Sequence, residues 1–361
     1  MTAQYVDTTV DAPTVDAPTV DTPDGSAQLA LLGFVAGLWE FKTLATAVEL
    51  DLFGTLADGR EATAEEIATE LDLPERPADM LLAACTSLGL VEKTGERFRN
   101  SDMAETVLVP DSPDYCGGFV TYFDTRGWRG WGRLTDALRE DRPTTWDPAE
   151  QDSPFAAEDQ EMLATFWSAI HNVGRSTARA LAGAYDFSVH QRLLDVGGGS
   201  GSYPIELCRV YPDLAATVYD LPHVVPLTQN EIDEADMGEQ ITAVAGDFFV
   251  DDELPAGHDV LLLGAVLHDW DEATNRMLLA KCHDALPPGG VLLIIELILD
   301  DERTGPPPAA LMGLNMIVET TGGRNYSKSE YTEWLIDAGF REVTTVPFVA
   351  EGATGAIVAR A

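Results

Sequence analysis

Short apolar runs alternate with helical patterns along the second half of the chain. The runs are short enough for buried strands, whereas the stretches between them repeat apolar residues at helical spacing. Strands that alternate with helices build a mostly parallel sheet with helices on both faces, so this pattern predicts an α/β, Rossmann-like fold. The predicted strands cover residues 193–197, 215–220, 240–245, 258–264, 290–298, 343–349 and 354–360.

The N-terminal third has a different, mostly helical pattern. Apolar residues recur at helical spacing over residues 28–52, and Thr63 with Glu66 forms a capping box that opens a second helix. A further helix over 77–88 and a small hairpin over 89–98 complete a winged helix-turn-helix pattern. DNA recognition by such a module needs basic side chains over phosphates, and 77–88 contains none.

Residues 1–25 carry a low-complexity repeat. The unit Val-Asp-Ala-Pro-Thr occurs twice in succession, from Val10 and from Val15. Regular prolines and acids cannot bury enough apolar surface to offset the entropy of the chain, so we expect a disordered leader here.

A glycine-rich turn follows the first predicted strand of the sheet. Asp195 is followed by Gly197, Gly199 and Gly201, and residue 202, where a dinucleotide fingerprint would need its third glycine, is Ser202. An acid beside the turn disfavours a phosphate and suits a ligand with ammonium and sulfonium charges. The alternative is an ordinary tight connection between a strand and a helix.

Acids also end the next two predicted strands. Asp220 ends the second strand, where a carboxylate commonly meets a ribose diol, and Asp247 with Phe248 ends the third. Because parallel strands end at the same edge of a sheet, the three acids are expected to converge on one crevice.

Five motifs in order resemble a known family. They are Asp195–Gly201, Tyr219–His223, Gly246–Phe248, His268–Trp270 and Gly322–Arg324. Together they resemble the S-adenosylmethionine-dependent small-molecule O-methyltransferases, which include the caffeic acid, acetylserotonin and hydroxyneurosporene enzymes. The resemblance implies a class I methyltransferase sheet, a homodimer and S-adenosylmethionine as methyl donor. It implies donor contacts from Asp195, Gly197, Gly199, Asp220, Leu221, Asp247 and Phe248.

The resemblance also implies a division into domains and a small hydroxylated acceptor, aromatic or polyketide-like. Residues 26–110 would be the winged-helix-like dimerisation domain, 111–185 a helical linker with the substrate pocket, and 186–361 the methyltransferase domain. The residues expected to line the acceptor pocket are Phe166, Ile170, Val173, Met312, Asn315 and Met316, although each could equally be plain core. His171 misses the family's histidine position and is treated as a bystander.

His268 and Asp269 lie at the mouth of the expected crevice. A phenol is a poor nucleophile at neutral pH, so an imidazole that takes its proton assists methyl transfer, and His268 fits that role. The resemblance implies that Glu296 orients His268, with a structural salt bridge as the alternative. Many relatives have Glu where this chain has Asn325, which can hydrogen bond but cannot compensate charge. Drift to hydroxylation or decarboxylation is therefore a rival hypothesis, which the intact His268 opposes.

The charge balance of the chain limits the kinds of partner that it can bind. The chain has 361 residues with 61 acids against 22 bases, a net charge of −39, which disfavours nucleic acid and anionic membranes. It is typical of proteins from salt-accumulating cells, although an acidic mesophilic protein is possible. The four scattered cysteines predict free thiols and no metal site, and the lack of a signal or membrane span predicts a cytoplasmic protein. A winged-helix ligand-sensing regulator and an inert donor-binding protein remain the competing classes.

Overall fold

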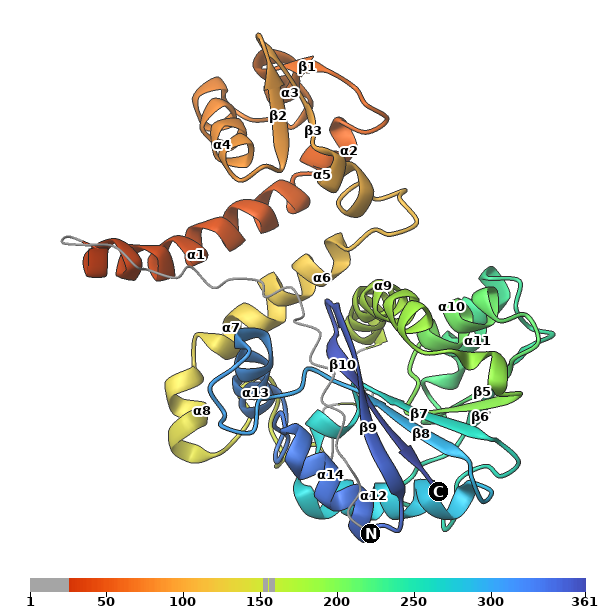
Figure 1. Cartoon of the computed structure of the whole chain (residues 1–361). Coiled ribbons are helices and arrows are strands. Elements are labelled where there is room, and N and C mark those ends of the chain that lie inside the picture. The colour runs from red at the N-terminus through yellow and green to blue at the C-terminus, as the bar shows by residue number, and fades with distance from the viewer. Residues whose placement is uncertain (1–25, 152–154, 156–159) are drawn as a thin grey trace.

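The structure is a computed structural model that describes residues 26–151, 155 and 160–361 (Figure 1). The predicted leader lies outside the described residues. The division of the chain at residues 110 and 185 stays a prediction.

The N-terminal part forms a small helical unit with its own core. The capping box at Thr63 is confirmed, since its hydroxyl accepts from the Glu66 N–H and the Glu66 carboxylate accepts from the Thr63 N–H. The single helix predicted over 28–52 is interrupted at Asp51, whose φ of 57° is left-handed. The elements are α1 (Ser26–Glu49), α2 (Leu52–Thr55), β1 (Ala62–Thr63), α3 (Ala64–Glu70), α4 (Glu75–Ser87), β2 (Val91–Thr94), β3 (Arg97–Asn100) and α5 (Asp102–Val107).

A run of short helices leads from this unit to the large sheet. One of them is a π-helix, η1 (Phe123–Gly127), and π turns change which side chains share a face. The others are α6 (Gly117–Tyr122), α7 (Trp128–Trp131), α8 (Leu134–Glu140) and the long α9 (Gln160–Ala184).

The C-terminal half is one twisted sheet in the order β6-β5-β4-β7-β8-β10-β9. The first five strands are parallel, and β10 runs antiparallel to both β8 and β9, so the predicted mostly parallel sheet is confirmed. The strand β8 ends earlier than predicted. The strands are β4 (Arg192–Val196), β5 (Ala215–Asp220), β6 (Ile241–Ala245), β7 (Val260–Gly264), β8 (Val291–Ile295), β9 (Arg341–Ala350) and β10 (Ala353–Arg360).

Helices cover both faces of this sheet (Figure 1). One apolar core contains side chains of β4 and β7 with Leu278 and Trp334, and the other packs the opposite face against Leu181 and Ile205. The strand order reverses between the neighbours β4 and β7, and a binding crevice opens at such a switch point. The remaining elements are η2 (Phe187–Val189), α10 (Ser202–Val210), α11 (Val225–Glu234), η3 (Leu267–Asp269), α12 (Glu272–Ala285), α13 (Pro307–Glu319) and α14 (Lys328–Asp337).

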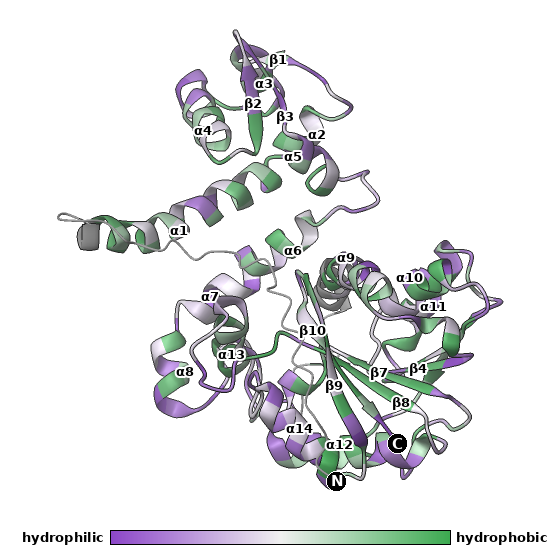
Figure 2. Cartoon of the chain, viewed as in Figure 1, coloured by the Kyte–Doolittle hydropathy of each residue, from purple (hydrophilic) through white to green (hydrophobic). Residues whose placement is uncertain are grey.

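The helix α1 presents apolar side chains to solvent. Phe34 is 84% exposed and Trp39 is 63% exposed, and Figure 2 shows apolar residues recurring along the helix. By length and composition alone, its stretch Leu29–Glu49 could cross a membrane, which differs from the sequence-based expectation. Apolar side chains gathered on one exposed face commonly mark a surface that contacts a partner.

Candidate active site

The glycine-rich turn lies at the carboxyl end of β4. Gly197, Gly199 and Gly201 adopt φ values of +69°, +55° and +75°, which side chains with a Cβ rarely tolerate. A Cβ on Gly199 would also lie only 2.4 Å from the ring of Trp167, which comes from α9. The turn therefore needs glycine for its backbone shape and for the close approach of α9.

Two of the predicted donor-binding acids lie beneath this turn. The Asp195 side chain is buried, and its Oδ2 has no hydrogen-bond partner among the described residues. Burial, reinforced by the charge of Asp220, raises the pKa of Asp195 to about 8. Asp220 accepts hydrogen bonds of 2.7 Å from the N–H groups of both Gly199 and Leu221. The structure thus brings both acids and the turn into one site.

The third strand end adds an acid and an aromatic wall. Asp247 accepts a 2.8 Å hydrogen bond from the N–H of Phe249, which shapes the turn after β6. Phe248 meets the ring of Trp270 edge-on, with centroids 6.0 Å apart and an interplanar angle of 87°. A Cβ on Gly197 would lie 3.9 Å from the Phe248 ring, so the aromatic wall adjoins the glycine-rich turn.

His268 lies in η3, immediately after β7, and is held by Glu296. The Nδ1 atom of His268 lies 2.6 Å from the Glu296 Oε2 atom, and Glu296 is fully buried at the end of β8. The other carboxylate oxygen accepts from the N–H groups of Leu267 at 3.0 Å and of His268 at 3.4 Å. Glu296 therefore fixes both the ring and the turn that carries it. It contacts Nδ1 of the ring and does not contact the second ring nitrogen, Nε2.

Two carboxylates set the protonation of this histidine. Burial lowers the pKa of His268, but the charges of Glu296 and Asp269 outweigh it and raise the pKa above its usual 6.5. The Asp269 Oδ1 atom lies 3.6 Å from Nε2 of His268. The imidazole consequently loses its proton at a higher pH than an ordinary histidine does.

Asn325 does not hydrogen bond to the imidazole in this structure. Its Nδ2 donates to the backbone carbonyl of Leu297 at 2.6 Å, and its Oδ1 has no partner in the described part of the chain. Leu297 follows Glu296, so Asn325 supports the strand end that carries the carboxylate. Of the two residues predicted to orient His268, only Glu296 contacts it.

The predicted acceptor-pocket residues come from two helices. Met312, Asn315 and Met316 share one face of α13, and the Asn315 Oδ1 accepts from Nε1 of Trp131 at 2.8 Å. Ile170 and Val173 are half-buried on α9. The side chain of Phe166 lies outside the described residues.

Sequence reasoning missed an ion pair beside this pocket. Arg126 of η1 and Glu319, the last residue of α13, lie 3.3 Å apart with side chains only 15% and 12% exposed. Glu319 is one helical turn beyond Asn315 and so extends the predicted pocket face. The four-residue spacing between Asn315 and Glu319 was the only feature of the sequence that could have pointed to Glu319.

Sequence reasoning also missed the role of His171, which contacts the glycine-rich turn. Its Nδ1 lies 2.9 Å from the Ser200 hydroxyl and its Nε2 lies 3.4 Å from a Glu231 carboxylate oxygen. Burial, with the charge of Arg175, lowers the pKa of His171 to about 4, so the ring is neutral at neutral pH and its hydrogen bond is the one with the Ser200 hydroxyl. The bystander interpretation therefore misses its contact with the turn.

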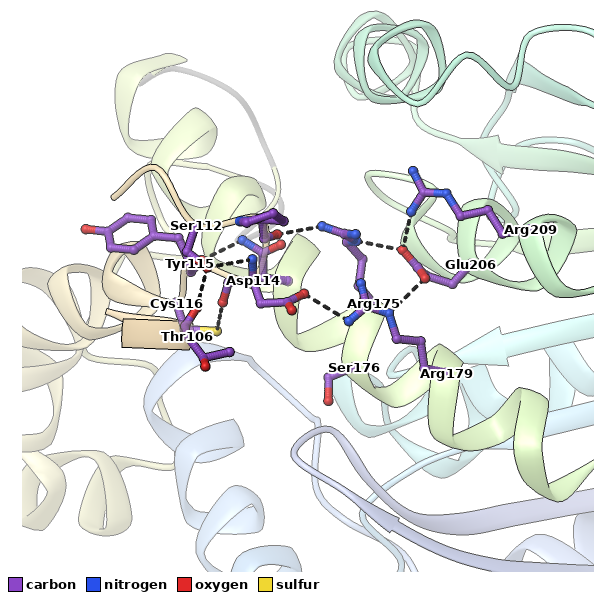
Figure 3. Close-up of polar contacts among 12 residues, drawn as sticks. Thr106, Ser112, Asp114, Tyr115, Cys116, Arg175, Ser176, Arg179, Glu206 and Arg209 are labelled. Atoms are coloured by element: carbon purple, nitrogen blue, oxygen red, sulfur yellow. Dashed lines mark hydrogen bonds and ion pairs between the residues drawn. The ribbon is translucent and has the colours of Figure 1, made fainter. Parts of the chain in front are cut away.

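A buried carboxylate on the helix after the glycine-rich turn is linked through arginines to the segment that leads from the N-terminal unit (Figure 3). Glu206 of α10 accepts from Arg175 at 2.7 Å and from Arg179 at 2.9 Å, both on α9, and from Arg209 at 2.5 Å. Arg179 also donates to Asp114 at 2.9 Å, and Arg175 donates to the backbone carbonyl of residue 113 at 2.7 Å. The helix that begins at the glycine-rich turn is thus tied to the segment leading from the N-terminal unit.

The comparisons with known proteins agree with this geometry. An O-methyltransferase domain model matches residues 131–341, and an O-methyltransferase dimerisation domain model matches residues 32–110. The chain is 48% identical over 327 residues to the 3-hydroxy-5-methyl-1-naphthoate 3-O-methyltransferase of Streptomyces sahachiroi, covering 91% of this chain and 93% of that protein. It is 34% identical over 316 residues to the tetracenomycin polyketide synthesis 8-O-methyl transferase TcmO of Streptomyces glaucescens, covering 87% and 92%.

A solved structure shows the same fold with the donor bound. The crystal structure of human N-acetylserotonin methyltransferase in complex with SAM superposes with a TM-score of 0.83 at 31% identity, covering 94% of this chain and 99% of that one. The predicted fold class, enzyme class and methyl donor are therefore confirmed. The chain belongs to the S-adenosylmethionine-dependent O-methyltransferases that carry an N-terminal dimerisation domain.

Proposed function

We propose that this protein methylates a phenolic hydroxyl of a small aromatic secondary metabolite, with His268 as general base. The observation that carries the proposal is the buried contact between His268 and Glu296 beside the crevice. The naphthoate and polyketide relatives support a fused aromatic acceptor.

The crevice fits S-adenosylmethionine. The unpartnered Oδ2 of Asp195 offers a buried acceptor to a cationic group, and the glycine-rich turn lets a ligand approach the backbone. Asp220 would hold the ribose hydroxyls with the lone pairs that its two backbone contacts leave, and Asp247 with Phe248 would lie near the adenine. The bound donor supplies a methyl group on a sulfonium, which leaves the sulfur with the electron pair of the broken S–C bond.

His268 would take the proton of the acceptor hydroxyl. Glu296 holds Nδ1, so the proton passes from the phenol oxygen to Nε2 while that oxygen forms the new bond to the methyl carbon. The resulting imidazolium is stabilised by the Glu296 carboxylate. Alignment of the two reactants supplies the larger share of the acceleration, about 7–11 kcal/mol.

The deciding experiment is incubation of the purified protein with methyl-labelled S-adenosylmethionine and a panel of hydroxylated naphthalenes and other phenols. Labelled methyl ethers should form from some members of the panel. Methylation of an amine panel in preference to every phenol would contradict the proposal, and so would donor binding without transfer to any acceptor.

We also propose that the exposed face of α1 pairs with a second copy of the chain. The face lies largely within the segment matched by the dimerisation domain, and its apolar side chains would lose their contact with water on association. Light scattering should give the mass of a dimer. Phe34→Asp with Trp39→Asp should yield monomers, and a monomeric wild type would contradict the proposal.

A further inference from the structure

The Arg126–Glu319 pair lies near the turn that carries the reacting histidine, close enough for the charge of Glu319 to act on Asp269. Glu319 is followed by Thr320, whose hydroxyl accepts a 2.9 Å hydrogen bond from the N–H of Gly323. A Cβ on Gly323 would lie 2.4 Å from the carbonyl oxygen of His268, so the loop that follows α13 packs directly on η3. Burial raises the pKa of Asp269 against the pull of His268, and the carboxylates of Glu296 and Glu319 add to that rise.

One carboxylate oxygen of Glu319 accepts several hydrogen bonds, whereas the other accepts none from the described residues. The Oε2 atom receives Nε and Nη2 of Arg126 at 3.4 and 3.3 Å and the hydroxyl of Thr145 at 2.8 Å. The Oε1 atom is buried and has no partner among the residues that the structure describes. A buried carboxylate oxygen without a donor costs about 1–3 kcal/mol, so its presence beside a reaction centre calls for a ligand.

The position of Glu319 on α13 directs it to the acceptor rather than to the donor. It shares a helix face with Met312, Asn315 and Met316, the residues predicted to line the acceptor pocket. The donor acids Asp195 and Asp220 lie instead under the glycine-rich turn.

We propose that Glu319 is a specificity-determining residue that accepts a hydrogen bond from a second, neutral donor on the acceptor, such as another phenolic hydroxyl. This inference rests on the proposed function, because it requires a phenolic acceptor whose reacting hydroxyl lies at His268. The acceptor's second hydroxyl donates to Oε1 of Glu319, and it is not itself methylated.

The local charges favour a neutral group over an anionic one. The guanidinium of Arg126 is already compensated by Glu319, and the nearby carboxylates of Asp269 and Glu296 share one imidazole. An acceptor carboxylate at this point would add a negative charge without a cation to balance it. A hydroxyl donor satisfies Oε1 without changing the charge of the site.

The test compares matched acceptors on matched variants. The probes are the dihydroxynaphthalene isomers, the methoxynaphthols of the same substitution and the two naphthols, because a methoxy group keeps the size of a hydroxyl but cannot donate. The wild type should methylate its best dihydroxynaphthalene with a kcat/KM about 10- to 100-fold above that for the matched methoxynaphthol. Equal values would overturn the inference while leaving phenol methylation intact, whereas no transfer to any probe would refute the proposed function itself.

The variants separate recognition from stability. Glu319→Gln keeps a carbonyl acceptor and should retain most of the preference. Arg126→Met/Glu319→Met removes both charges at similar side-chain length, which avoids a buried unpaired cation, and should abolish the preference by lowering only the value for the dihydroxynaphthalene. The control Arg60→Met/Glu70→Met removes an ion pair of the N-terminal unit and should leave the ratio unchanged.

Two outcomes would count against the inference. An equal fall for both acceptors in the double variant, with a lowered unfolding temperature, would assign the pair a purely structural role. A preference for hydroxynaphthoic acids that disappears in Arg126→Gln but survives in Glu319→Gln would assign the site to an anionic group instead.

Discussion

The donor side and the acceptor side of the crevice are built in different ways. The donor side is formed by a turn of contiguous residues and by acids at the ends of adjacent strands, so the main chain shapes it. The proposed acceptor side is formed by side chains of η1, α7, α9 and α13, among which Trp131 contacts Asn315 and Arg126 contacts Glu319. Replacements on the acceptor side can therefore change the acceptor without disturbing the donor.

The largest expected effect comes from replacing His268, which lies between the donor side and the acceptor side of the crevice. His268→Ala should lower turnover of a weakly acidic phenol by about 10²–10⁴-fold, the usual range for loss of a general base. Donor affinity measured by calorimetry should stay unchanged, because the ring is proposed to contact the acceptor and not the donor. The loss should shrink for phenols that are ionised at the assay pH, and His283→Ala serves as the control. Wild-type turnover in His268→Ala would show that the histidine is not the base.

A second prediction concerns the carboxylate behind the base. Glu296→Gln should lower turnover less than His268→Ala does, and should move the pH dependence. Since Glu296 helps to raise the pKa of His268, the neutral base forms at a higher pH in the wild type, and kcat/KM rises at a correspondingly higher pH. In the variant the rising limb should shift to lower pH. Asn325→Ala, which does not contact the ring, should leave the limb in place, and an unshifted limb in Glu296→Gln would contradict the assignment.

The donor side should respond through binding. Asp220→Ala should weaken S-adenosylmethionine by at least about tenfold, because the carboxylate both orders the Gly199 N–H and is proposed to hold the ribose. Calorimetry checks this, with Asp213→Ala on the exposed turn before β5 as the control. If the affinity of Asp220→Ala matched that of the wild type, the donor would have to bind elsewhere.

The smallest expected effect is that of salt on the stability of the whole protein, which concerns the donor side and the acceptor side equally. The unfolding temperature should rise by several degrees between about 0.1 M and 2 M KCl, because the Debye length falls to about 3 Å at 1 M and repulsion among 61 acids is screened. Calorimetric scans test this. A temperature independent of salt would contradict the adaptation to a saline cytosol that the charge balance suggests.

The contrast between the two sides also explains what the sequence could predict. The strands, the capping box at Thr63 and the turn after Asp195 follow from local periodicity and residue type, so they are visible in the chain. The contact of His268 with Glu296 spans 28 residues and was expected only through the family resemblance. The orientation of Asn325 toward the Leu297 carbonyl depends on packing and could not be read from its motif.

The ion pair on the proposed acceptor side could not be predicted from local sequence patterns, for a physical reason. Arg126 and Glu319 are 193 residues apart, and their pairing depends on how η1 lies against α13. A π-helix leaves no simple periodic signal, so the face that Arg126 presents could not be deduced. Helical spacing could have indicated only that Glu319 shares a face with Asn315, and not that it pairs with Arg126.

The arginines around Glu206 bear on how the enzyme tolerates salt. The chain has only 22 basic residues, yet Arg175, Arg179 and Arg209 all surround one carboxylate that is only 6% exposed. Screening acts through mobile ions in water, so concentrated salt weakens exposed pairs such as Arg60 with Glu70 much more than a pair excluded from solvent. The Arg175–Glu206 pair, whose side chains are only 15% and 6% exposed, is consequently shielded from the ionic strength of the solvent, whereas concentrated salt should weaken the Arg179–Asp114 pair, which is about as exposed as Arg60 with Glu70.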